Sequence, residues 1–137
     1  WILLNGTESM EVVKAEKKKT LIVGATDNPS RYAYLAAQMF DDRGMDFIPI
    51  GIKKGEVFGK EILDLRSKPE LNGIHTITLY IGPANQSEWI DYLIGLKPKR
   101  IIFNPGTENN ELRRIAEQAG IETEYACSLV LLRTGQY

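Results

Sequence analysis

The sequence predicts an α/β fold, in which helices cover both faces of a doubly wound, five-stranded parallel sheet. Its first support is a series of short apolar and β-branched runs, which are typical of buried strands. Segments with apolar residues at helical spacing alternate with most of these runs. Alternation of this kind requires a parallel sheet with right-handed crossovers. The predicted strands are 20–23, 47–50, 74–81, 99–103 and 121–125.

The length of 137 residues suits one domain with a single core. A formal net charge of −1 provides no basic field for nucleic acid. No apolar run reaches the roughly 18 residues that a membrane helix needs. One cysteine excludes an internal disulfide framework, and with a single histidine it argues against a zinc site. We therefore expect a cytoplasmic domain that binds neither nucleic acid nor a membrane.

Residues 1–19 form a separate predicted segment, and the domain is expected to occupy residues 20–137. The segment starts with an apolar stretch and ends in a run of lysines. It is interpreted as an ordered arm, a cloning remnant or the end of a longer N-terminus. Asn5 and Thr7 match the N-glycosylation pattern. Because no secretory signal is evident, this match is attributed to chance.

The organising element is the turn from the first strand into the first helix. Gly24 ends the strand, Asn28 is expected to cap the helix, and Pro29 suits its first position. A strand, a glycine turn and a helix N-terminus in this order bind phosphate in doubly wound folds. The Thr26 hydroxyl and the Arg31 guanidinium, expected in the first helical turn, can donate to phosphate oxygens.

That turn does not carry the dinucleotide pattern G-x-G-x-x-G, since only the first glycine, Gly24, is present. The sequence favours a phosphorylated ligand without indicating NAD. An ordinary βα turn with a solvated Arg31 is the alternative interpretation.

The end of the second strand indicates which ribose the ligand carries. Gly51 is followed by Lys53 and Lys54, with no carboxylate before Glu56. In NAD-binding folds an acidic residue at this place receives the ribose hydroxyls. Two lysines instead favour a phosphate on the ribose, as in CoA (3′-phosphate) or NADP (2′-phosphate). A flexible basic loop is the alternative.

Two further predicted strands, 74–81 and 99–103, also end in glycine turns, at Gly82 and Gly106. These ends are expected at one edge of the sheet, where small residues would let a long, flat ligand approach the backbone. The link over 57–67 is expected to be irregular. A capping box at 85–88 is predicted to start the next helix, and an apolar run at 129–132 to close the core.

Four blocks resemble the small single-domain bacterial CoA-binding proteins. They are VGATDNPSRYAY, FIPIGIKKGEVFGK, TLYIGP and FNPGTEN, at residues 23–34, 47–60, 78–83 and 103–109. This family is similar to the CoA-binding domain of the succinyl-CoA synthetase α subunit, and the resemblance extends over residues 20–132. It implies a Rossmann-like fold with strand order 3-2-1-4-5. The synthetase's phosphohistidine and partner subunit have no counterpart here, so ligase activity is not implied.

The resemblance implies a CoA site at the carboxyl edge of the sheet. The diphosphate and ribose are expected near Gly24, Ala25, Thr26 and Arg31. The adenine end is expected beside Ile50, Gly51 and Lys53, and across Ile81, Gly82 and Pro83. Asn28, Asn104 and Gly106 complete the predicted site. Where family members often carry Trp-x-Gln-x-Gly, this chain has Phe103-Asn104-Pro105-Gly106, so the path of the pantetheine arm is left unassigned.

The favoured function is non-catalytic binding of CoA or an acyl-CoA, because no triad, carboxylate pair or metal cluster falls at the strand ends. An NADP-binding oxidoreductase-like domain is one alternative, and a CoA-responsive regulatory or interaction subunit with a protein partner is another. His75, at the start of its strand, is expected to be structural. Cys127 has a counterpart in many family members. A buried core thiol is favoured there over a redox partner of the CoA thiol.

Overall fold

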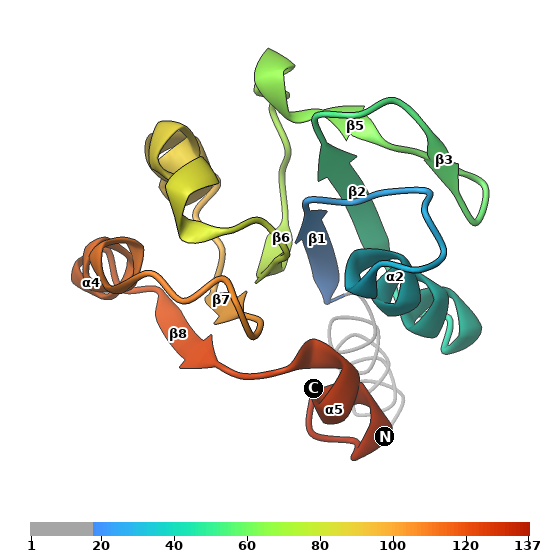
Figure 1. Cartoon of the computed structure of the whole chain (residues 1–137). Helices are drawn as coiled ribbons and strands as arrows, with labels where there is room; N and C mark the ends of the chain where they lie inside the picture. The colour runs from blue at the N-terminus through green and yellow to red at the C-terminus, as the bar shows by residue number, and fades with distance from the viewer. Residues whose placement is uncertain (1–17) are drawn as a thin grey trace, which may run out of the picture.

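The computed structural model describes residues 18–137, so the predictions for residues 1–17 lie outside it. Its centre is a parallel sheet of six strands in the order β5-β2-β1-β6-β7-β8 (Figure 1). These strands are β1 (Lys19–Val23), β2 (Phe47–Gly51), β5 (Leu63–Asp64), β6 (Ile74–Leu79), β7 (Arg100–Phe103) and β8 (Glu122–Tyr125). A separate antiparallel hairpin consists of β3 (Glu56–Val57) and β4 (Lys60–Glu61).

The predicted α/β fold is confirmed, but the number and order of the strands need correction. The sequence predicts five strands in the order 3-2-1-4-5, with 74–81 as the third. The structure adds β5 within the irregular link, so the chain-order numbering of the sheet becomes 3-2-1-4-5-6. The strand at 74–79 is therefore the fourth, and it lies beside β1 on the side away from β2. A strand of two residues is too short to leave an alternating pattern in a sequence.

Helices cover both faces of the sheet, as Figure 1 shows. Helices α2 (Tyr32–Asp42) and α5 (Ser128–Arg133) contact each other on one face. Helices α3 (Ile90–Gly95) and α4 (Asn110–Gln118) pack on the other. Two buried apolar clusters correspond to the two faces, and the neighbouring β1 residues Leu21 and Ile22 belong to different clusters. This follows from the two-residue period of a strand.

Helix α2 begins later than predicted. Its first residue is Tyr32 and its N-cap is Arg31, whereas the sequence pattern places the start at Pro29. The Asn28 side chain does not cap the helix. Its Oδ1 atom accepts hydrogen bonds from the Ser30 backbone N–H and hydroxyl, at 3.0 and 2.8 Å. This local turn is the known competitor of helix initiation for an asparagine, and it delays α2.

Helix α3 also begins later than the predicted capping box. Two 3₁₀ turns, η2 (Pro83–Asn85) and η3 (Ser87–Trp89), precede it. Gln86, between them, is fully buried. Its amide donates to the carbonyls of Ile81 and Thr107, at 2.9 and 2.7 Å. The glutamine therefore joins the loops after β6 and β7 instead of starting a helix.

The β3–β4 hairpin packs beside α2. Its two turn residues, Phe58 and Gly59, both have positive φ angles, of 50° and 80°, as a type I′ hairpin turn requires. The Phe58 ring lies 5.2 Å from the ring of Tyr34 in α2, and Val57 is buried in the same apolar cluster as that helix. A third 3₁₀ turn, η1 (Leu65–Ser67), follows β5. Between residues 18 and 137 no helix is long and apolar enough to cross a membrane.

Candidate functional site

The candidate site lies at the carboxyl ends of the central strands. The chain proceeds from β1 to β2 on one side and reaches β6 on the other, so the strand order reverses between β1 and β6. Ligands of doubly wound sheets bind beside such a reversal, outside the carboxyl ends of the strands. The loops after β1, β2, β6 and β7 all start at this edge.

Three strand ends are packed tightly against one another. The backbone N–H groups of Gly24 and Ala25 donate to the carbonyl of Ile50, at 2.9 and 3.0 Å. Gly24 has a φ of +97°, and a Cβ atom there would lie 2.8 Å from Cγ2 of Ile81. A Cβ atom at Gly51 would lie 2.8 Å from the Ala25 carbonyl oxygen. These two glycines are therefore required by the close approach of the strand ends to one another.

Replacing Gly51 with alanine is expected to destabilise the fold by about 1–3 kcal/mol, the usual cost of overpacking. The added Cβ would overlap a backbone oxygen, which has no rotamer to escape into. Gly82→Ala at the same edge is the matched control, since nothing lies within 4 Å of its added Cβ, and its effect should stay within about 0.5 kcal/mol. Urea unfolding measures both; equal stability of the two variants would contradict the packing argument.

The turn after β1 offers hydrogen-bond donors. Arg31 is exposed and makes no ion pair with any residue from 18 to 137. The N-terminus of α2 has no side-chain cap, so its first N–H groups remain available to an anion. The Thr26 hydroxyl oxygen accepts the Asn28 backbone N–H at 3.1 Å, and its own hydrogen is free to donate. An anionic group placed here would meet both backbone and side-chain donors.

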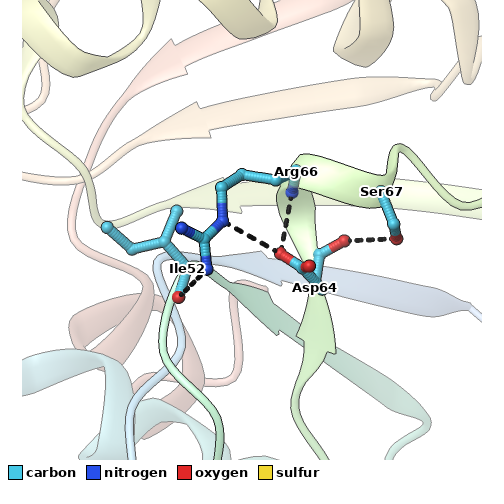
Figure 2. A network of polar contacts seen from close by, with 4 residues as sticks. All are labelled: Ile52, Asp64, Arg66 and Ser67. Carbon is cyan, nitrogen blue, oxygen red and sulfur yellow. Dashed lines mark hydrogen bonds and ion pairs between the residues drawn. The ribbon is translucent and has the colours of Figure 1, made fainter.

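The end of β2 lies beside a further cationic side chain that the sequence did not indicate, Arg66, which is paired with Asp64. Ile52, Lys53 and Lys54 are exposed. Arg66, from the turn after β5, donates from Nη2 to the Ile52 carbonyl at 3.0 Å (Figure 2). Asp64 accepts from the backbone N–H and from Nε of Arg66, at 3.0 and 3.4 Å. The sequence did not reveal Arg66, because only the pairing of β2 with β5 brings it to this place.

Asn104 and Gly106, both predicted to contact the ligand, differ in position. Gly106 is exposed, whereas Asn104 is only 2% exposed. The Asn104 amide nitrogen donates to Oγ1 of Thr78 at 2.7 Å and to the Leu79 carbonyl at 2.8 Å. Its Oδ1 atom accepts from the Ser128 backbone N–H at 2.8 Å. The structure thus directs the Asn104 side chain into the protein interior, where it joins β6, β7 and α5.

Two further residues singled out in the sequence lie at opposite ends of the sheet. Cys127 is half-buried at the N-cap of α5, after the carboxyl end of β8. His75 is half-buried near the amino end of β6, away from the candidate site, and its Nδ1 lies 2.8 Å from Oγ1 of Thr76. Burial, with Lys18 and Arg100 nearby, lowers the pKa of His75, so its ring is neutral at neutral pH.

Comparison with known proteins shows the family of the chain. The sequence matches the model of the CoA binding domain family over residues 18–133. The chain belongs to this family. All residues of the predicted CoA site lie within the matched part of this CoA-binding domain.

Several solved structures share the fold of this chain. One protein, described as uncharacterized, is 52% identical, with a TM-score of 0.84 over 88% of this chain and 98% of that chain. A hypothetical protein from Pyrococcus horikoshii is 25% identical, with a TM-score of 0.70 over 88% and 83%. A protein from Thermus thermophilus is 19% identical, with a TM-score of 0.74 over 95% and 98%, and shows the fold alone. No curated protein matches the sequence.

Proposed function

We propose that this domain binds CoA or an acyl-CoA at the carboxyl edge of its sheet without transforming it. The family match over almost the whole described chain carries the proposal. The diphosphate would lie at the turn after β1, where Arg31, Thr26 and the uncapped N-terminus of α2 supply donors. The adenosine end would lie between the ends of β2 and β6, beside the exposed Ile52 and Lys53.

Native mass spectrometry of protein purified without added ligand tests this proposal directly. A retained CoA or acyl-CoA would identify the ligand by its mass. A domain that emerges empty and also fails to bind added CoA would contradict the proposed function.

Calorimetry is expected to show tighter binding of CoA than of NAD, by about tenfold or more. The reason is that Lys53 or Lys54 would contact a ribose phosphate that NAD lacks, and a charge-assisted hydrogen bond contributes about 1.5–3 kcal/mol. Equal binding of NAD would contradict this use of the basic loop. NADP serves as the third ligand, because tighter binding of NADP than of CoA would favour the oxidoreductase-like alternative.

A further inference from the structure

The pairing of β2 with β5 creates a contact that the chain order alone would not suggest. In this pair Gly51 lies opposite Asp64. The turn that follows β5 therefore places Arg66 over the loop after β2, where Nη2 reaches the Ile52 carbonyl (Figure 2). The guanidinium thus contacts the peptide bond between Ile52 and Lys53. This is the loop in which the sequence predicts a contact with a ribose phosphate.

The Arg66 guanidinium retains donors for a ligand. It has five N–H groups in a fixed fork, and its contacts with residues 18–137 occupy Nε and one hydrogen of Nη2. Its side chain is 66% exposed, so the other donors face solvent. Nη2 donates to the Ile52 carbonyl at 3.0 Å and Nε lies 3.4 Å from Asp64, so two surface contacts orient the fork before any ligand arrives. A pre-oriented fork suits a phosphate better than a freely rotating lysine does.

The one carboxylate in this network is already occupied. Asp64 is the last residue of β5 and lies opposite Gly51 of β2, close to where an acidic residue would receive an unphosphorylated ribose. Its Oδ1 atom instead accepts the backbone N–H and Nε of Arg66. Arg66 thereby offsets the Asp64 charge, whereas Lys53 and Lys54 form no ion pair with residues 18–137.

We propose that Arg66 is a specificity-determining residue that recognises the ribose phosphate of the bound nucleotide. The inference rests on the proposed CoA-binding function and adds a residue to it. By engaging Asp64 and presenting its remaining donors beside Lys53, Arg66 selects ligands that carry a 3′-phosphate over those with a free ribose.

The test compares CoA with 3′-dephospho-CoA, which lacks only that phosphate, by calorimetry on the full chain. Arg66→Ala should weaken CoA binding about tenfold while the affinity for dephospho-CoA stays within about twofold. Arg66→Lys should recover part of the loss, since it keeps the charge without the fork. Arg113→Ala is the matched control, because that arginine also donates from Nε to a carboxylate, 3.0 Å away on Glu117, and should change neither affinity.

The alternative role for Arg66 is purely structural, as a clamp on the Ile52 carbonyl. In that case Arg66→Ala would weaken both nucleotides by the same factor, and the assignment would be overturned while CoA binding itself stood. Unchanged binding of both nucleotides would also overturn it. Failure of the unsubstituted protein to bind either nucleotide would remove the proposed function and this assignment together. Circular dichroism checks that each variant is folded, so that any loss of affinity refers to folded protein.

Discussion

Replacing Asn104 with alanine is expected to destabilise the CoA-binding domain by about 3–5 kcal/mol, the sum of several unpaired polar groups and a small cavity. The side chain is 2% exposed and every polar atom of its amide is engaged. Its loss would leave the Leu79 carbonyl and the Ser128 N–H without these partners, in a region that water does not reach. Because Ser128 begins α5, that helix should detach first.

Urea unfolding of the Asn104→Ala variant measures this cost. Asn85→Ala is the matched control: Asn85 is exposed, makes no side-chain hydrogen bond to the described part of the chain, and should change stability by no more than about 0.5 kcal/mol. The opposite pattern would be informative. An Asn104→Ala protein of ordinary stability that has lost CoA would make this residue the ligand contact that the sequence analysis predicts.

Strands β1, β2, β6 and β7 were predictable because each leaves a run of apolar or β-branched residues with a glycine at its end or within three residues after it. β5 was not, because two residues form no pattern and its pairing with Ile50 and Gly51 depends on tertiary structure. The predicted start of α2 was wrong for a different reason. Asn28 and Pro29 carry the composition of a helix start, but the Asn28 side chain bonds to Ser30 and closes a separate turn.

For the candidate site, too, some features could be predicted from the sequence and others depend on tertiary structure. Sequence reasoning expected the loops after β1, β2 and β6 to share one edge of the sheet, and in the structure they do. It also selected Arg31 and Lys53 as ligand contacts from their charges, and those contacts remain predictions. It placed Gly51 beside the ligand. In the structure, an added Cβ atom at Gly51 would lie 2.8 Å from the Ala25 carbonyl oxygen, so the packing of the chain itself requires glycine there. Arg66 was not predicted as a site residue, because it follows β5, a strand that the sequence pattern did not predict. Charge and composition therefore identify side chains that could bind, whereas the distances between loops decide which of them meet.

Arg31→Ala is expected to weaken CoA binding by roughly tenfold to a hundredfold, the range for losing one charge-assisted hydrogen bond. Arg31 is the N-cap residue of α2, so its guanidinium starts at the same end of the helix as the uncapped N–H groups. Positive charge and backbone donors at one place are what a diphosphate requires. Calorimetry with CoA measures the loss, and dephospho-CoA should lose as much, since the diphosphate is common to both.

The fold should hardly respond to this substitution. The Arg31 side chain is exposed, caps nothing and pairs with no acid among residues 18–137, so the change in unfolding free energy should stay within about 0.5 kcal/mol. Arg114→Ala, on α4, is the control for a removed surface charge and should leave affinity unchanged. An Arg31→Ala protein that unfolds readily, yet binds CoA normally per folded molecule, would make Arg31 a structural residue and move the diphosphate away from this turn. A loss with Arg114→Ala would instead point to the open hollow that Arg114 lines on α4.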